Sequence, residues 1–436
     1  MHKAVFMCGK SASVAVGLVA VVAAIAASSA AAGTGTPTVQ PRLVDDAQAQ
    51  ALTTTIGGAD VLPTTRTVPH WWGSTFDPHD GIAHGYNIVG ADPNTCSGSS
   101  CSVTVEVDIT PLIVDIDGMT FDGTDVLAAL LASPEFGLND YGSTPYASAG
   151  PALIAPRGPG GVLSQGDAGL PLQLQDATMR AQFNRTGSSN YHLRLHPNVM
   201  PAVTLDVPNN QGLLLQNPRG NIYAAARFRW WSERIRNLVT KADPTHLALY
   251  LTDDVRIFAG DTKSPFCCFD GYHSADPSTS VGNAAVQTYA WATWLSPGLQ
   301  ARRDGTIVWT RQDMWALSHE VAEWASDPFL TNIVEQWGYP YAPGLFCSPF
   351  LETGDAVTTA GFAMGTNTFR QGPNPNGTQS ADGYYHPEDE VMLPWFMRVA
   401  PNTISEPTQT PSPNIGRYTF MGDLNTFGFD VPSGGC

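Results

Sequence analysis

Residues 309–328 read Trp309-Thr-Arg-Gln-Asp-Met-Trp-Ala-Leu-Ser-His-Glu-Val-Ala-Glu-Trp-Ala-Ser-Asp-Pro328, and this stretch decides the fold expected for the second half of the chain. Thr310 followed by Asp313 resembles a helix-capping arrangement, and Pro328 ends a helix, so about four helical turns are predicted. Apolar residues recur every three or four positions and form one core-facing stripe, made of Met314, Leu317, Val321 and Trp324. The polar residues lie on nearly the opposite side, and they are His319, Glu323 and Asp327, with Glu320 at their flank.

The spacing of His319, Glu320 and Glu323 resembles that of the ligand and general-base residues on the helix of a zinc hydrolase. A His and a Glu one turn apart can share one metal ion, and a Glu directly after the His can act as general base on a water. Glu323 stands where the usual His-Glu-x-x-His pattern has its second His. Because a carboxylate is both a competent zinc ligand and an ordinary surface group, a solvated helix face is the alternative.

Two other segments carry residues suited to the same site. Leu351-Glu352-Thr-Gly-Asp355 offers two carboxylates in a glycine-bearing loop shortly after the helix. Cys267-Cys-Phe-Asp-Gly-Tyr-His273 offers a histidine beside two adjacent cysteines. By sequence position the first segment is placed to complete a metal site. For His273 the alternative is a partly buried side chain with a structural hydrogen bond.

Five motifs follow one another between residues 249 and 395. They are Leu249-Tyr-Leu-Thr-Asp-Asp-Val255, Phe266-Cys267 with Gly271-Tyr-His273, Ser318 to Pro328, Glu352-Thr-Gly-Asp355 and Met392-Leu-Pro-Trp395. In this order they resemble the C-terminal half of bacterial secreted proteins with a His-Glu-x-x-Glu metallopeptidase-like motif, distantly similar to the plant Exordium or phosphate-induced extracellular protein family. The resemblance implies a metallopeptidase helix followed by a Gly-Glu-Ile-Gly-Asp-type loop, which maps onto Glu352 and Asp355. The plant relatives keep the surrounding pattern without the His-Glu pair.

From these observations we expect a secreted zinc-dependent hydrolase, most plausibly a peptidase. His319 and Glu323 are expected to bind zinc, Asp355 or Glu352 to supply the third ligand, and Glu320 to activate the water. His273 is expected to orient the substrate or to stabilise the developing oxyanion.

The expected fold class is α+β, with a β-rich N-terminal domain followed by an α+β zincin-like domain. Residues 102–110 alternate between apolar and polar side chains, which predicts a strand, and residues 246–251 form an apolar run suited to a buried strand. Residues 224–239 are read as a helix. Four segments are therefore expected: a signal peptide (1–32), a flexible lead-in (33–66), the β-rich domain (67–218) and the metallohydrolase-like domain (219–436).

The N-terminus has the features of a cleavable secretory signal. Lys3 and Lys10 give a positive start, Val14 to Ala27 is apolar but short for a membrane span, and Ala30 to Ala32 offer a cleavage site. The sequence therefore predicts an extracellular protein without stable membrane insertion, with a retained membrane anchor as the alternative.

Cysteine usage agrees with export. Of the 7 cysteines, Cys8 lies in the expected signal, and the other six are an even number in an oxidising compartment. Cys96 and Cys101 could close a local loop. Cys267 and Cys268 are expected to find separate partners, for which Cys347 and Cys436 remain.

Charge and aromatic residues limit the partners. With 22 basic and 39 acidic residues the net charge is −17, so nucleic acid is not expected as a partner. A peptide or protein substrate is expected, and the oligomeric state is left open. The competing hypothesis is a non-catalytic extracellular protein that binds cell-wall polysaccharide through aromatic pairs, namely Trp71-Trp72, Trp230-Trp231 and Tyr384-Tyr385. A third option is glycoside hydrolysis by the carboxylates of Glu388 and Glu390.

Overall fold

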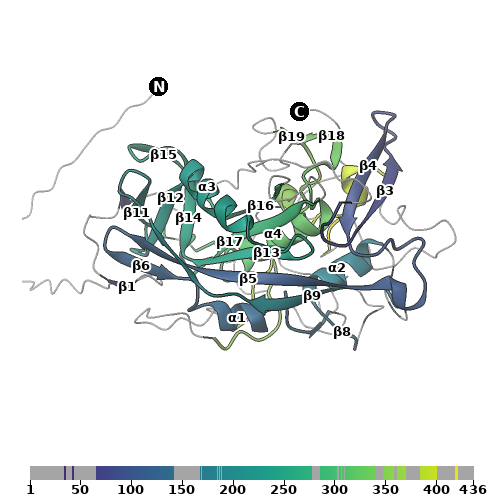
Figure 1. The fold of residues 1–436 in the computed structure, drawn as a ribbon, viewed down its shortest axis with the longest axis horizontal. Helices are drawn as coiled ribbons and strands as arrows, with labels where there is room; N and C mark the ends of the chain where they lie inside the picture. Colours follow the sequence, from purple (N-terminus) through teal and green to yellow (C-terminus); the bar gives the residue numbers. More distant parts are fainter. Residues whose placement is uncertain are drawn as a thin grey trace, which may run out of the picture.

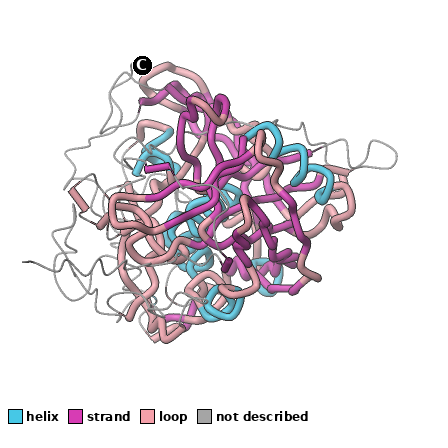
Figure 2. Tube along the Cα trace, turned by 90° about the vertical axis from the view of Figure 1, so that its left-hand side faces the viewer, coloured by secondary structure: helices cyan, strands magenta, loops and turns pink. Residues whose placement is uncertain are grey.

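Strands dominate the fold. The computed structural model describes residues 34–35, 42–43 and 65–420, except 142–166, 168, 184, 186, 188, 277–284, 302–303, 306, 309, 339–346, 358–360, 370–382 and 400–417. Of the described residues, 43% lie in strands and 18% in helices, and Figure 2 shows how strands outweigh helices. The expectation of an α+β zincin-like domain is therefore wrong. The periodicity of one helix led to it, whereas the described residues between 222 and 294 include the six strands β12 to β17.

The largest sheet is organised around one long strand. β5 (Ser102–Ile116) alternates buried and less buried positions, as the sequence predicts, and in Figure 1 it runs across most of the view, with β9 beside its first half. The sheet order is β1-β6-β5-β13-β17-β16, and β9 and β10 also pair with β5. The bounds are β1 Thr34–Gly35, β6 Met119–Asp122, β9 His192–Val199, β10 Val203–Asp206, β13 Leu247–Asp253, β16 Gly271–Asp276 and β17 Gln287–Trp294.

This sheet separates two hydrophobic cores, because successive side chains of a strand point to opposite faces. Along β13, Leu247, Leu249 and Leu251 enter the core that also holds Leu317 and Val321 of α4 (Trp315–Ser326). The intervening Ala248 and Tyr250 enter the core beneath α3 (Phe228–Val239), where Trp231 packs on Trp291 with ring centroids 5.1 Å apart. The same alternation places His273 of β16 on the α4 face, together with Gly271 and Ala275.

A second sheet, in the order β15-β14-β12-β11-β2, adjoins the first. The first residues of the predicted helix 224–239 form part of its strand β12, so the helix begins only at Phe228. Ala224 to Ala226 pair with strands on both sides, and Arg227 pairs with β14; this pairing outweighs the helix propensity of alanine. The bounds are β2 Arg42–Leu43, β11 Gly212–Gln216, β12 Ile222–Arg227, β14 Val255–Asp261 and β15 Ser264–Phe269.

The expected domain boundary at residues 218 and 219 crosses the large sheet. β13 lies after this boundary and pairs in parallel with β5, which lies before it. One core also joins side chains from both parts, including Val105, Leu193 and Trp324. The two expected domains thus share a sheet and a core.

Smaller elements surround the sheets. The hairpin of β3 (His70–Phe76) and β4 (Ala83–Val89) extends away from the rest of the fold in Figure 1. The remaining elements are η2 Gly98–Cys101, α1 Leu127–Ala132, β7 Asn139–Asp140, β8 Pro171–Leu172, α2 Leu174–Gln182, β18 Ile333–Gly338, β19 Cys347–Phe350, η5 Asp355–Val357 and α5 Leu393–Phe396. Among the described residues, no helix is long and apolar enough to cross a membrane.

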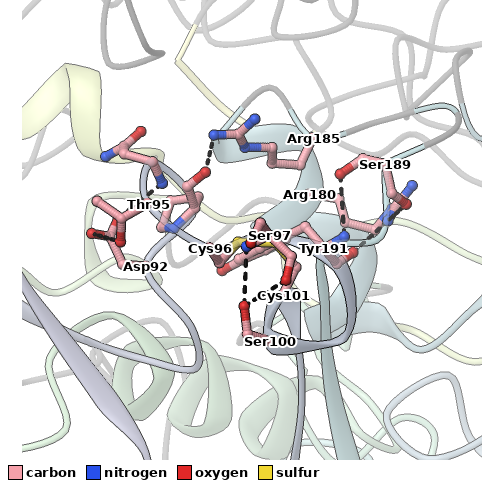
Figure 3. The surroundings of a disulfide bond; sticks show 12 residues. Asp92, Thr95, Cys96, Ser97, Ser100, Cys101, Arg180, Arg185, Ser189 and Tyr191 are labelled. Atoms are coloured by element: carbon pink, nitrogen blue, oxygen red, sulfur yellow. Dashed lines mark hydrogen bonds between the residues drawn. A yellow bond between two sulfur atoms is a disulfide. The ribbon is translucent and has the colours of Figure 1, made fainter.

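A disulfide joins Cys96 and Cys101, which is the local closure that the sequence suggested (Figure 3). Within the closed loop the Ser97 N–H donates to Ser100 Oγ at 3.0 Å. Cys267 and Cys268 are bonded to each other, so the expectation of separate partners is wrong. The expected signal peptide, most of the lead-in and Cys436 lie outside the described residues.

Candidate functional site

The six residues singled out from the sequence converge on one pocket. Helix α4 supplies His319, Glu320 and Glu323, and strand β16 supplies His273 at the edge of the large sheet. The segment after β19 supplies two carboxylates, Glu352 and Asp355. Apolar side chains, among them Phe269, Trp315 and Leu330, complete the lining.

The polar side of α4 is buried, so the alternative of a solvated helix face is wrong. His319, Glu320 and Glu323 are only 6%, 5% and 2% exposed. The backbones of two other segments lie directly against these side chains. At Gly271 the approach is so close that a Cβ would lie 2.5 Å from Glu320 Cγ. A Cβ at Gly354 would lie 2.8 Å from His319 Cε1. Both segments can meet the helix at these points because glycine has no side chain.

One set of donor atoms gathers around the Nε2 atom of His319. Glu323 Oε1 lies 3.2 Å from this nitrogen and Asp355 Oδ1 lies 3.6 Å from it. Two zinc ligands at about 2.1 Å and a tetrahedral angle are about 3.4 Å apart, so both distances suit a shared ion. The Gly354 and Asp355 N–H groups donate to Glu323 Oε1 at 3.2 and 3.1 Å and thereby fix its carboxylate.

A second set gathers around His273. Its Nδ1 atom lies 3.5 Å from Glu323 Oε2 and 3.7 Å from Glu320 Oε2. Its Nε2 atom faces Glu352, whose Oε2 is 3.8 Å away. Glu352 thus lies on the far side of the imidazole, while Asp355 is the carboxylate that faces His319. The structure therefore favours Asp355 over Glu352 as the third member of the His319 set.

Glu388 belongs to the site, although the sequence did not indicate it as such. Its carboxylate contacts His319 Nδ1, and its N–H donates to Ser318 Oγ at 2.9 Å. Its suggested glycosidase partner Glu390 accepts a hydrogen bond from Gln175 Nε2 instead. Glu388 lies 69 residues beyond His319, and no fixed spacing connects them.

Burial and mutual charge perturb these groups. Burial alone lowers the pKa of His319, but Glu323 and Glu388 outweigh it and raise this pKa well above its ordinary value. The pKa of Glu323 is lowered despite its burial, because His319 and His273 stabilise the carboxylate. Burial raises the pKa of Glu320 and brings that of Glu388 to about 8. A cationic centre thus stabilises Glu323, the carboxylate that the two histidines share.

The donor set fits a zinc ion. Imidazole nitrogens and carboxylate oxygens are the ligands expected for zinc without cysteine. Among the described residues, His273 Nε2 and both carboxylate oxygens of Glu352 have no hydrogen-bond partner although they are buried. Unpartnered buried polar atoms are costly in a structural cluster and common where a ligand or ion is to bind.

No family model, curated protein or solved structure matches this chain. The site's function is therefore inferred from its own residues.

Proposed function

We propose that the protein is a zinc-dependent hydrolase whose ion is held by His319, Glu323 and Asp355. The observation that carries this proposal is the spacing of His319 Nε2, Glu323 Oε1 and Asp355 Oδ1, which are buried side by side in one pocket. A peptide or protein substrate is proposed because the order of motifs resembles that of metallopeptidase-like secreted proteins.

Glu320 and His273 have separate roles beside this set of ligands. Zinc in such a site supplies Lewis acidity, which polarises a carbonyl group and lowers the pKa of a water to about 7. Glu320 lies beside the set in the pocket and accepts the proton of the attacking water. His273 places positive charge on the other side of Glu323, where it stabilises negative charge developing on the substrate.

Two carboxylates position the histidines. Glu388 contacts the ring nitrogen of His319 that faces away from Glu323, and Glu352 faces the corresponding nitrogen of His273. A carboxylate on the second nitrogen of a ligating histidine fixes its tautomer and ring orientation. Glu352, expected as a possible zinc ligand, takes this orienting role in the proposal.

We further propose that the protein acts outside the cytoplasm, because its first 32 residues have the sequence features of a secretory signal. N-terminal sequencing of protein from the culture medium tests this proposal. A mature N-terminus near residue 33 supports it, and one at Met1 contradicts it.

The test of the proposed function separates metal binding from hydrolysis. His319→Ala should lose stoichiometric zinc, because it removes the only nitrogen of the proposed set. Glu320→Gln should keep zinc at this set, while cleavage of a peptide library falls by roughly two to four orders of magnitude. Glu233→Gln, on the exposed side of α3, is the matched control and should leave both unchanged.

Two results would overturn the proposal. One is wild-type protein that takes up no zinc after zinc supplementation. The other is zinc-loaded protein that cleaves no member of a broad peptide library.

One observation favours a second candidate function, binding of cell-wall polysaccharide without catalysis. Trp72 and Phe76 are 66% and 57% exposed on one face of the β3–β4 hairpin. The Trp72 indole lies beside Gly85, where a Cβ would be 3.2 Å from Nε1, and offers a flat face for stacking on a sugar. By contrast Trp71, Trp230, Trp231 and Tyr385 are buried. Under this candidate, Trp72→Ala should release the protein from insoluble wall polysaccharide, whereas His319→Ala should not.

A further inference from the structure

The Glu323 carboxylate faces two different sets of donor atoms. Its Oε1 lies near His319 Nε2, and its Oε2 lies near His273 Nδ1. Three candidate ligand atoms gather on each side, and they come from His319, Glu323 and Asp355 or from His273, Glu320 and Glu323. A carboxylate that bridges two cations about 3.5–4 Å apart is common in two-metal hydrolase sites.

The distances in the His273 set resemble those in the His319 set. Nδ1 of His273 is 3.5 and 3.7 Å from the two Glu oxygens, compared with 3.2 and 3.6 Å around Nε2 of His319. Both sets lie near the spacing of about 3.4 Å expected for two ligands of one tetrahedral zinc ion.

The surroundings of the two histidines also match. Each imidazole has one nitrogen towards Glu323 and the other towards a buried carboxylate, which is Glu388 for His319 and Glu352 for His273. Both Glu352 oxygens and His273 Nε2 are buried, and no hydrogen-bond partner for them lies in the described part of the chain. The contact of Glu388 with His319 Nδ1 matches the carboxylate–histidine–metal pattern, in which the outer carboxylate orients the ligating ring. Glu352 holds the corresponding place beside His273 Nε2, at 3.8 Å and so beyond hydrogen-bond distance.

We propose that His273, Glu320 and Glu323 hold a second divalent cation, so that the site is a two-cation centre bridged by Glu323. This proposal rests on the proposed function, because it identifies the positive centre on the His273 side as a cation. Glu320 keeps its role in hydrolysis: its Oε2 faces His273, while its Oε1 lies beside Gly271 and can accept the proton.

The test is the zinc stoichiometry of the purified full chain. Chelator-treated protein is dialysed against zinc chloride, and bound zinc is measured by atomic spectroscopy. We expect two ions per chain in the wild type and one in His273→Ala. His196→Ala removes a surface histidine that pairs with Glu106, so it is the matched control and should still bind two.

A second variant and a second probe guard against misfolding of His273→Ala. Glu320→Gln should retain the first ion and weaken the second at least ten-fold, with an unchanged circular dichroism spectrum. Protein loaded with cobalt(II) should show magnetic coupling between two ions in electron paramagnetic resonance. His273→Ala should show the signal of one isolated ion.

The outcomes distinguish the two proposals. One ion per chain that disappears in His319→Ala but remains in His273→Ala overturns the second site and leaves the proposed function intact. One ion that disappears in both variants overturns the second site as well, because a single ion would then use both histidines. No bound zinc at all overturns both proposals.

Discussion

Replacing Gly354 with alanine perturbs the first cation set without removing any donor atom. A methyl group at this position would come within 2.8 Å of the Cγ and Cε1 atoms of His319. Ordinary carbon contacts are longer, so the ring or the loop must move by about 0.5–1 Å. The Gly354 N–H also donates to Glu323 Oε1, so a shift of the loop disturbs the orientation of Glu323 as well.

The expected effect follows from this displacement. The distances from His319 Nε2 to Glu323 and Asp355, 3.2 and 3.6 Å, leave little tolerance for a shared ion. A misplacement of about 1 Å costs on the order of a hundred-fold in activity, and we expect zinc affinity to fall roughly ten- to a hundred-fold. Overpacking should also destabilise the metal-free protein by about 1–3 kcal/mol. Calorimetric titration of chelator-treated protein with zinc measures the affinity, and urea unfolding measures the stability.

Gly271→Ala is the matched control, since its methyl group would meet Glu320 at 2.5 Å rather than His319. It should lower hydrolysis while the ion at His319 keeps its wild-type affinity. The reasoning is refuted if folded Gly354→Ala binds its first zinc ion as tightly as the wild type.

Two further predictions concern buried carboxyl groups. Glu388→Gln should weaken zinc binding ten- to a hundred-fold, because an amide holds the His319 ring less firmly than a carboxylate does. Glu390→Gln is the control, since Glu390 faces Gln175 instead of His319. Equal zinc affinities in the two variants would contradict the prediction. Burial raises the pKa of Glu135 from 4.5 to about 8, so between these values the folded state holds a proton that the unfolded state has released. The free energy of unfolding should therefore fall as the pH rises from 4.5 to 8, by up to about 1.4 kcal/mol per pH unit. Urea unfolding in chelator should show a flatter dependence for Glu135→Gln, and an unchanged slope would count against this assignment.

The sequence predicted single elements better than their assembly. The alternation of residues 102–110 corresponds to β5, and the apolar run 246–251 corresponds to β13. A strand buried on one face has alternating apolar residues and a strand buried on both faces has continuous ones, so both patterns can be recognised in the sequence. The zincin-like fold was wrong, because helical periodicity describes α4 itself and not the sheet against which it packs. Residues 224–227 were assigned to a helix for a related reason, since only the neighbouring strands make them a strand.

The proposed site could be predicted further than the fold, because its donor residues lie at short spacings that chemistry restricts. His319 and Glu323 are one helical turn apart with Glu320 between them, and Glu352 and Asp355 share one loop. Sequence spacing could not distinguish which carboxylate faces which histidine. It also did not connect Glu388 with His319: the sequence suggested Glu388 only as a glycosidase carboxylate beside Glu390, and Glu388 reaches His319 only through tertiary structure.

Two glycines explain why the polar side of α4 is buried and not solvated. Gly271 lies two residues before His273, and Gly354 lies directly before Asp355. At both positions a Cβ would collide with a polar side chain of the helix, which is Glu320 in one case and His319 in the other. A polar helix face approached by two such backbones cannot be solvated, and its carboxylates lose water that only hydrogen bonds or cations can replace. Because His319, Glu320 and Glu323 belong to the two buried sets of candidate ligand atoms, the burial that these glycines permit favours bound cations over a solvated face.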